Sequence, residues 1–554
     1  FDEWPLKLFV LRWYFLPYYC LKSAANLQVL RLVQTDSCYF NNWFLSLHQF
    51  PPTVDRKMKL LTAEQFRMAD VNTIKNEPIS SVDLMERAAK SCCQELTKNV
   101  DEKDELCILC GPGNNGGDGL AIARILADSG KKVTVILTGN SDKLSPDAAT
   151  NFQKLQKTSA KILYLTDADL PLANTTVWVD AIFGSGLNKA VEKNIADLIH
   201  KVNATGAPVF SIDLPTGLFA DKHTPSDDAV IHASTTLTFQ RPKRCMLYAE
   251  NAHRNGEVKV LDIGLDERYI ESLNSAHELV DRCMIKKLLK PRKRFSHKGN
   301  FGHALLIGGS YGKAGAIALS AKACVKSGAG LTTVHTIKTT GLALQSSIPE
   351  VMLSTCEGDK VSDLPDLKPY SAIASGPGLG IYEETTNMIG HLLVKANSPL
   401  VLDADALNII SENKKLLNLI PENTIITPHK KEFERLFGVF ENDFQRNDFQ
   451  IAASVKHKIV IVLKGVYTSI STPDGRCFFN TTGNAGLAKG GSGDTLTGIV
   501  AAMLAQGLTA ADAAIAAVFI HGLAADCAVK KIHPYALTAS DVTEYLSEAF
   551  MQTV

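Results

Sequence analysis

Strand-like apolar runs alternate with helical segments in two separate parts of this chain. In the first part, residues 105–111 (ELCILCG) are apolar, residues 118–130 have helical spacing and end at a glycine, and residues 131–139 (KKVTVILTG) are apolar again. This strand–loop–helix–strand order is a βαβ unit, which requires a parallel sheet with helices on its faces. The same alternation returns beyond residue 298. We therefore predict an α/β protein with two doubly wound domains.

A chain of 554 residues is too long for one ordinary hydrophobic core. We expect a first domain over residues 58–270, a charged linker over 271–297 and a second domain over 298–554. Residues 1–57 lie before the first methionine of the chain and hold three of its four tryptophans. Their apolar stretch is short and interrupted for a membrane span, and it lacks the ordered regions of a signal peptide. We expect this segment to be a non-native or disordered extension.

Charge and cysteine content narrow the class of protein. Lysine plus arginine balance aspartate plus glutamate, 58 against 58, which gives no reason to expect a nucleic-acid or membrane partner. The twelve cysteines form no recurring framework, which is typical of the reducing cytoplasm, where we expect the protein to act. Cys107 and Cys110 form a CxxC within an apolar run, and we interpret them as strand residues, with a redox pair as the alternative. We expect small-molecule substrates and a homo-oligomer.

Polar side chains follow three predicted strands of the first domain. The loop that we expect at residues 111–119, GPGNNGGDG, supplies two amides and a carboxylate, and Asp180 and Asp213 end later strands. Ligands bind at this edge of an open α/β sheet, and the oxygen ligands favour a polar substrate and a cation. The loop also satisfies GxGxxG, but the next strand ends in LTGN without an acidic residue. We therefore reject a hydride-transferring dinucleotide site.

The stretch at residues 481–507, TTGNAGLAKGGSGDTLTGIVAAMLAQG, begins with glycines and continues with apolar residues at helical spacing. Gly490, Gly491 and Gly493 allow the backbone to expose consecutive N–H groups, and the helix dipole points the same way, so the turn is an anion site. Asp494 follows at once and would be repelled by a phosphate. Its natural task is to take a proton from a hydroxyl that attacks the phosphate. The alternative is a glycine-rich helix cap with a solvated aspartate.

Other predicted strands of the second domain also end in polar or glycine-rich segments. These are GPGLG at 376–380, VLDAD with Asp403 and Asp405, TPH with His429, and LKG with Lys464. The chain contains no GxxxxGK[ST] sequence, which excludes a P-loop nucleotide site.

The segments GPGNNGGDG, VDAIFGSGL and SIDLPTG resemble the YjeF N-terminal domain, the NAD(P)H-hydrate epimerase, over about residues 58–269. The resemblance implies that potassium is bound by Asn115, Asp180 and Thr216, the last of which is often serine in the family. We also expect Asp213 to be catalytic. The implied contacts to the hydrated nicotinamide nucleotide are Asn114, Asn115, Gly116, Gly117, Asp118, Gly184, Ser185, Gly186, Leu187, Asn188, Lys189, Ala190 and Asp213.

The second half of the chain, about residues 275–554, resembles the ribokinase-like fold and, within it, the YjeF C-terminal domain, the ADP-dependent NAD(P)H-hydrate dehydratase. The motifs are HKG…GGS, GPGLG, DADALN, TPH, KG..T and GGSGD. The implied donor is ADP, used with Mg²⁺, and Asp494 is the implied base. Lys489 stands where a small residue is common, and we expect it to be exposed. The implied nucleotide contacts are Lys464, Gly465, Val466, Tyr467, Thr468 and Gly493, and the implied substrate contacts are Ala316, Gly378, His429 and Asp494.

The two resemblances together imply an enzyme that interconverts the R and S forms of hydrated NAD(P)H and dehydrates the S form. Phosphorylation of the C6 hydroxyl makes a good leaving group from a poor one. One alternative is a ribokinase-like kinase for a vitamin precursor, which would release a stable phosphorylated product. A second alternative is a binding protein whose first domain has no catalytic role.

Overall fold

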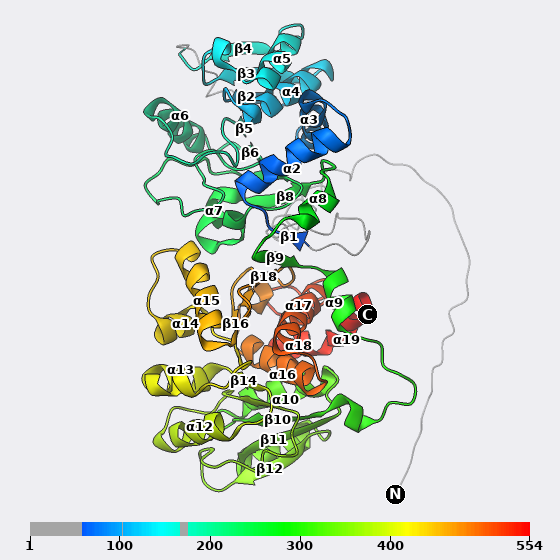
Figure 1. Ribbon diagram of the computed structural model, residues 1–554, viewed down its shortest axis with the longest axis vertical. Helices are drawn as coiled ribbons and strands as arrows, with labels where there is room; N and C mark the ends of the chain where they lie inside the picture. The colour runs from blue at the N-terminus through cyan, green and yellow to red at the C-terminus, as the bar shows by residue number, and fades with distance from the viewer. Residues whose placement is uncertain (1–57, 102, 167–175) are drawn as a thin grey trace, which may run out of the picture. The chain divides into compact units, whose positions relative to one another are not determined.

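The computed structural model describes residues 58–101, 103–166 and 176–554 of the chain. The expectation for residues 1–57 therefore lies outside the described residues. The described part contains a seven-stranded sheet and an eleven-stranded sheet, in agreement with the predicted two α/β domains (Figure 1).

The smaller sheet is parallel throughout and has the strand order β4-β3-β2-β5-β6-β7-β8. Because the order reverses between β2 and β5, the carboxyl ends of these two strands flank the switch point of the sheet, where ligands bind in folds of this type. The apolar runs at residues 105–111 and 131–139 predicted β2 and β3, and the predicted strands that end at Asp180 and Asp213 are β5 and β6. The strands are β2 (Glu105–Cys110), β3 (Lys132–Leu137), β4 (Lys161–Tyr164), β5 (Val177–Ala181), β6 (Val209–Ile212), β7 (Thr235–Phe239) and β8 (Glu257–Leu261).

Helices of the first domain begin where the sequence offers caps. Thr62 and Ser80 each form a capping box ahead of α2 (Ala63–Asn76) and α3 (Ser81–Leu96). Cys107 and Cys110 lie on β2 and point into separate apolar clusters on its two faces, so the strand interpretation of the CxxC is confirmed. The remaining longer helices of this domain are α4 (Asn114–Asp128), α5 (Pro146–Leu155) and α6 (Lys193–Ala204).

The larger sheet has the order β1-β9-β18-β17-β16-β15-β14-β13-β10-β11-β12. Its strands from β16 to β12 in this order are parallel, which places their carboxyl ends at one edge. The strands are β1 (Met58–Lys59), β9 (His277–Val280), β10 (His303–Ile307), β11 (Leu331–Ile337), β12 (Met352–Cys356), β13 (Ala372–Ser375), β14 (Leu400–Leu402), β15 (Ile425–Ile426), β16 (Val460–Leu463), β17 (Ser469–Ser471) and β18 (Cys477–Asn480).

The expected linker, residues 271–297, contains regular structure in its first part. Strand β9 pairs in parallel with β18, and helix α9 (Arg282–Leu288) follows it. A run of lysine and arginine dominated the sequence pattern there and concealed the short strand HELV. A second domain that is taken to begin after residue 280 would therefore lack one strand of the larger sheet.

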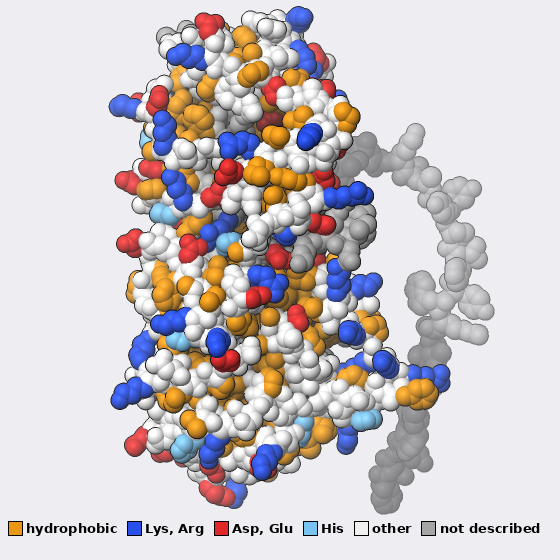
Figure 2. Space-filling model, viewed as in Figure 1, with side chains coloured by type: hydrophobic (Ala, Val, Ile, Leu, Met, Phe, Trp, Pro, Cys, Tyr) orange, Lys and Arg blue, Asp and Glu red, His pale blue; other side chains and the backbone are white. Residues whose placement is uncertain are grey.

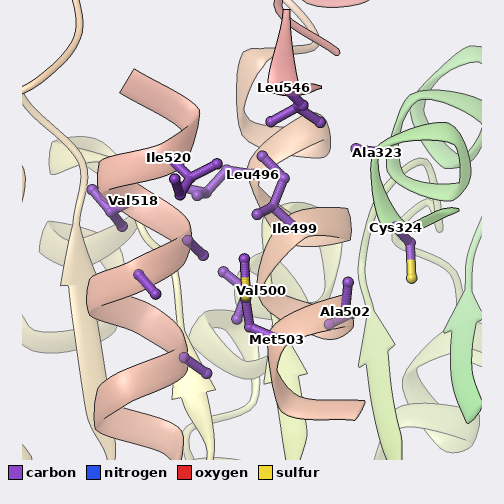
Figure 3. Close-up of a cluster of buried hydrophobic side chains, with 14 of the residues drawn as sticks. Ala323, Cys324, Leu496, Ile499, Val500, Ala502, Met503, Val518, Ile520 and Leu546 are labelled. Carbon is purple, nitrogen blue, oxygen red and sulfur yellow. The ribbon is translucent and has the colours of Figure 1, made fainter. Parts of the chain in front are cut away.

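Helices α10 (Ala314–Lys326), α16 (Ser492–Ala505) and α17 (Ala510–Ala528) form much of the core of the second domain. Leu496, Ile499, Val500 and Met503 of α16 are at most 4% exposed and lie between α17 and α10 (Figure 3). This burial fixes α16, and therefore fixes the glycine turn that precedes it. Helix α17 is long and apolar enough to span a membrane, but 83% of its apolar window is buried inside the molecule, as expected for a core helix.

Further helices of the second domain are α11 (Lys338–Ser347), α12 (Glu383–Lys395), α13 (Ala404–Glu412), α14 (Lys430–Phe437), α15 (Asp443–His457), α18 (Ala539–Glu544) and α19 (Leu546–Thr553). On the face shown in Figure 2, lysine and arginine side chains are interspersed with aspartate and glutamate.

Candidate functional site

In the first domain, the residues NNGGD form the beginning of a helix. Helix α4 starts at Asn114, so the expectation that residues 111–119 are a loop is wrong from that position onward. Glycine is needed here because a Cβ on Gly116 would lie 1.8 Å from the carbonyl oxygen of Gly111. The close approach lets α4 start directly beyond β2, so its unpaired N–H groups face the carboxyl edge of the sheet.

Three of the predicted residues come together at this edge. A Cβ on Gly184 would lie 2.7 Å from Oδ2 of Asp213 and 3.1 Å from Oδ1 of Asn115. Oδ2 of Asp213 also accepts a hydrogen bond of 2.8 Å from the backbone N–H of Ser185. Sequence reasoning placed these residues on separate segments, and the structure joins them in one cluster.

A buried lysine, which the sequence analysis missed, completes this cluster. Nζ of Lys243 forms an ion pair with Oδ1 of Asp213 and donates a 2.7 Å hydrogen bond to Oγ1 of Thr238. It also lies 4.3 Å from the centre of the Phe66 ring. The available signal was weak: Lys243 follows the carboxyl end of β7, but it stands in the run RPKR, which resembles an ordinary charged surface turn.

Two further carboxyl groups, those of Asp70 on α2 and Asp118 on α4, lie close enough to interact with the charge of Asp213. Burial raises the pKa of Asp213, but Lys243 and the hydrogen bonds from Ser185 outweigh burial and bring the pKa below its usual value. Burial raises the pKa of Asp70 to about 7, and the charge of Asp213 adds to this increase. Burial, followed by the charges of Asp213 and Asp70, also raises the pKa of Asp118. The cluster therefore holds an ionised Asp213 beside carboxyl groups that retain protons more readily.

The predicted potassium ligand Asp180 is fully buried and accepts four hydrogen bonds. Its donors are the hydroxyl of Ser211 (2.8 Å), the N–H (2.8 Å) and hydroxyl (2.6 Å) of Thr216, and the N–H of Ile182 (3.3 Å). Burial raises the pKa of Asp180 despite these bonds. Asp180 and Thr216 are thus adjacent, as the predicted ion site requires, and they also tie β5 to the turn after β6.

The third predicted ligand, Asn115, has a buried Nδ2 atom without a hydrogen-bond partner among the described residues. The predicted substrate contacts at residues 184–190 differ in their exposure. Gly184 and Ser185 face the cluster, whereas Gly186, Asn188, Lys189 and Ala190 are exposed at the surface.

In the second domain, a buried carboxylate anchors the predicted nucleotide site. Asp403 follows β14 and accepts hydrogen bonds from Nζ of Lys464 (2.9 Å) and from Oγ1 of Thr497 on α16 (2.7 Å). It is 1% exposed, whereas the Lys464 side chain is 22% exposed. Burial lowers the pKa of Lys464, but the charges of Asp403 and Glu432 outweigh burial and raise it. Lys464 is therefore a fixed cation that a ligand can still reach.

The glycine turn lies directly beside this lysine. Gly491 caps α16 with a φ of 92°, a conformation that favours glycine, and a Cβ on Gly493 would lie 3.2 Å from Nζ of Lys464. Asp494 is half-buried. Burial raises its pKa to about 6, the charge of Asp403 adds to the increase, and Lys464 opposes it. An amide-lined turn, a cation and a basic carboxylate thus adjoin one another.

The predicted substrate contacts Ala316, Gly378 and His429 come from three segments that follow β10, β13 and β15. Gly378 has a φ of 61°, and a Cβ there would lie 3.3 Å from the Cβ of Ala316 on α10. His429 caps α14, with Nδ1 accepting from the Glu432 N–H at 3.2 Å, and its side chain is 50% exposed. A backbone bridge joins His429 to Lys464, so His429 lies at the same edge of the sheet.

The segment after Lys464 forms a short turn. The Thr468 hydroxyl donates to the Gly465 carbonyl at 3.1 Å, and it accepts from the Gly465 N–H at 3.3 Å. Val466 is 63% exposed and Tyr467 is half-buried, which leaves this turn open to a ligand. Lys489 is exposed, as expected, and donates to the carbonyl oxygen of Tyr535.

Comparison with known proteins identifies both halves. A family model described as NAD(P)H-hydrate dehydratase matches residues 304–548, and one described as YjeF-related protein N-terminus matches residues 81–245. The chain is 37% identical over 475 residues to the bifunctional NAD(P)H-hydrate repair enzyme of Coxiella burnetii, covering 84% of this chain and 94% of that protein. It is 34% identical over 510 residues to the enzyme of that name from Moorella thermoacetica, covering 88% and 96%.

Among solved structures, the ADP/ATP-dependent NAD(P)H-hydrate dehydratase of Bacillus subtilis, co-crystallised with ATP and Mg²⁺, is 31% identical. The structural match covers 50% of this chain and 98% of the Bacillus chain, with a TM-score of 0.44. The match to the full-length relatives extends across both domains and over nearly their whole length. This chain belongs to the family of bifunctional NAD(P)H-hydrate repair enzymes.

Proposed function

We propose that the chain repairs hydrated NADH and NADPH in two steps, one in each domain. The first domain interconverts the R and S epimers, and the second dehydrates the S epimer with ADP as the phosphoryl donor. The observation that carries the proposal is the junction at the start of α16, where Gly493, Lys464 and Asp494 adjoin. A glycine-amide anion site, a reachable cation and a basic carboxylate are the parts that phosphoryl transfer needs.

The dehydration step follows from this arrangement. Asp494 takes the proton of the C6 hydroxyl while the hydroxyl oxygen attacks the terminal phosphorus of ADP, and AMP leaves. The C6–O bond then breaks with release of phosphate, and loss of a ring proton from the adjacent carbon restores the double bond of NAD(P)H. Because the pKa of Asp494 is about 6, its carboxylate is ionised at neutral pH and is still basic enough to accept a proton.

The nucleotide contacts that we propose are residues 464–468 and Gly493, and the substrate contacts are Ala316, Gly378, His429 and Asp494. The choice of ADP over ATP rests on the family resemblance. Mg²⁺ is usually bound by one or two carboxylates together with substrate phosphates. The partly exposed carboxylate of Asp405 offers such a donor near the end of β14. When bound, the ion would neutralise charge on the phosphates.

In the first domain we propose that Asn114–Asp118, Gly184–Ala190 and Asp213 hold the hydrated nucleotide, with Asp213 as the catalytic carboxylate. The residues of the proposed potassium site offer oxygen atoms that can act as ligands of the ion. Oγ1 of Thr216 lies 2.6 Å from Oδ1 of Asp180 and 3.3 Å from the carbonyl oxygen of Phe183, and the amide oxygen Oδ1 of Asn115 lies beside Gly184, the residue after Phe183. Oxygen atoms of this kind suit a hard cation, which would supply a fixed positive charge.

One experiment tests the whole proposal. The protein is incubated with an epimer mixture of hydrated NADH and ADP, and the absorbance of reduced nicotinamide is followed. Complete recovery from the mixture requires both activities, whereas recovery of only the S fraction shows dehydration alone. Accumulation of a stable phosphorylated product would instead favour the ribokinase-like kinase. A homo-oligomer and a cytoplasmic location remain predictions.

A further inference from the structure

We propose that Lys243 is a positioning residue for epimerisation, which acts by fixing the carboxylate of Asp213 toward Gly184 and Asn115. This inference rests on the proposed epimerase activity. Nothing in the sequence patterns pointed to Lys243; it follows from contacts in the structure.

The Lys243 ammonium is held by three separate groups. It pairs with Oδ1 of Asp213, donates to Oγ1 of Thr238 on β7, and lies over the Phe66 ring of α2. Only 2% of the Lys243 side chain is exposed, so it is packed behind Asp213 with little access to a ligand. A lysine side chain loses much rotamer freedom on burial, and these contacts restrict its ammonium to one place.

The two oxygens of Asp213 are held from opposite segments. Lys243 holds Oδ1, and the N–H of Ser185, which directly follows Gly184, binds Oδ2 at 2.8 Å. The Asp213 backbone has a φ of 65°, a conformation that non-glycine residues seldom adopt. Such a conformation persists where the surroundings impose it, and the contacts at both carboxylate oxygens hold the side chain from two sides.

Burying an ion pair is a poor way to stabilise a fold. Removing an ammonium and a carboxylate from water is costly, and well-packed apolar residues often replace such a pair without loss of stability. A charge held behind a candidate catalytic carboxylate has a different use, because it keeps that carboxylate ionised and oriented. Burial alone would raise the pKa of Asp213, so this carboxylate needs a cation beside it to remain ionised.

A partly buried ion pair elsewhere in the same domain serves as a control. Lys259 on β8 binds Glu95 of α3 at 2.7 Å, and the side chains are 17% and 8% exposed. This pair has no contact with Asp213, Gly184 or Asn115 among the hydrogen bonds of the described residues. Replacing Lys259 removes a partly buried ammonium from the same domain without changing a residue of the candidate site.

The test compares Lys243→Met, Lys243→Arg and Lys259→Met in the full-length chain. Interconversion of the R and S epimers is measured without ADP, and dehydration of the S epimer with ADP reports on the other domain. We expect Lys243→Met to lower the epimerisation kcat by about 10–100-fold, as is usual for residues that orient a reacting group, with a small change in KM. Lys243→Arg should recover part of the kcat, and Lys259→Met should epimerise normally.

Several outcomes would overturn the inference. These are a folded Lys243→Met chain that epimerises at the wild-type rate, a loss confined to KM, or an equal loss in Lys259→Met. If Lys243→Met does not fold, Thr238→Val removes one contact of the ammonium and leaves both charges in place; an unchanged epimerisation kcat in that variant would also overturn it. A wild-type chain that does not interconvert the epimers would contradict the proposed function itself.

Discussion

Each domain places a lysine–aspartate pair with one nearly fully buried member at the carboxyl edge of its sheet, and these two pairs differ in their access to ligands. In the first domain the Lys243 side chain is 2% exposed and lies behind Asp213. In the second, Lys464 is 22% exposed and lies beside Gly493, while its partner Asp403 is 1% exposed. In the first pair the carboxylate faces the candidate site, and in the second pair the lysine does.

This reversal matches the chemistry proposed for each domain. Phosphoryl transfer needs a cation for the phosphates, and a buried Asp403 holds Lys464 ready for that purpose. The base is then a separate carboxylate, Asp494, with a pKa of about 6. Where the substrate reacts without phosphate, the carboxylate itself is presented and the lysine stays behind it. The same pair of residue types thus serves two kinds of site according to which member is buried.

The largest expected effect is on the base of the second domain. Asp494→Asn keeps the shape of the side chain and removes its basicity. Dehydration turnover should therefore fall by about 10²–10⁴-fold, the rate contribution that a positioned general base usually makes. ADP affinity should be retained or increase, because a negative charge near the phosphates is removed. Single-turnover dehydration and ADP binding are the measurements, and epimerisation by the same molecule is the control. Near-normal turnover in a folded Asn variant would contradict the role of Asp494.

The sequence predicted the two α/β domains because strands and helices of this class carry strong periodic patterns. It also placed Asp213, Asp403 and Asp494 at strand or helix ends, since each directly adjoins an apolar run. Short-range patterns do not show which side chains meet across strands. Lys243 was missed for this reason: its partners Asp213 and Phe66 lie 30 or more positions away, and only the fold brings them together.

The start of α4 and strand β9 were missed for different reasons. The NNGGD run contains two glycines, which lower helix propensity, but Gly116 is required where α4 packs on Gly111. Tertiary packing therefore overrides propensity there. Strand β9 is only four residues long and is followed by a charged run, so it gives little periodic signal of its own.

The second prediction tests whether the first site depends on its oxygen cluster. Asp180→Ala removes a charged ligand of the proposed potassium site, so epimerisation should fall by about 10–100-fold while dehydration persists. It also leaves the donors on Ser211 and Thr216 without their acceptor, at a cost of about 1–3 kcal/mol for each buried group left unpaired. Both activities and thermal unfolding should be measured with potassium present and absent. An equal loss of both activities in a folded variant would assign Asp180 a purely structural role.

A third change blocks the approach of phosphate to Lys464. A Cβ at Gly493 would lie 3.2 Å from Nζ of Lys464 and 3.7 Å from Oδ2 of Asp403, so Gly493→Val places a branched side chain where the phosphates should bind. ADP affinity should fall about tenfold or more, which is about 1.4 kcal/mol. Gly390→Val on α12 is the control outside the turn, because a Cβ at Gly390 meets only the Leu416 side chain, at 3.7 Å. Equal losses in both variants would show that close approach at Gly493 is not the cause.

The fourth prediction concerns pH. The base must be ionised to act, so kcat/KM for dehydration should be level above a pH of about 6 and fall below it, by about twofold at the pKa and about tenfold for each further unit. Epimerisation, which uses an Asp213 whose pKa lies below its usual value, should not share this decline. ADP binding measured over the same range separates titration of Asp494 from titration of the nucleotide. Dehydration that stays level down to pH 5 would contradict a basic Asp494.

The smallest change is expected when the first domain is removed altogether. The residues of the two candidate sites do not overlap, so a fragment that begins at Ser275 should dehydrate the S epimer at a rate comparable with the full chain and should not act on the R epimer. Starting at Ser275 matters because β9 lies at residues 277–280 and pairs along its length with β18, whereas a fragment from Asp281 would lack it and expose that edge. We therefore expect the Asp281 fragment to unfold at a lower temperature than the Ser275 fragment. A folded Ser275 fragment without dehydratase activity would show that the second site needs residues of the first domain. The two lysine–aspartate pairs would then not belong to independent sites.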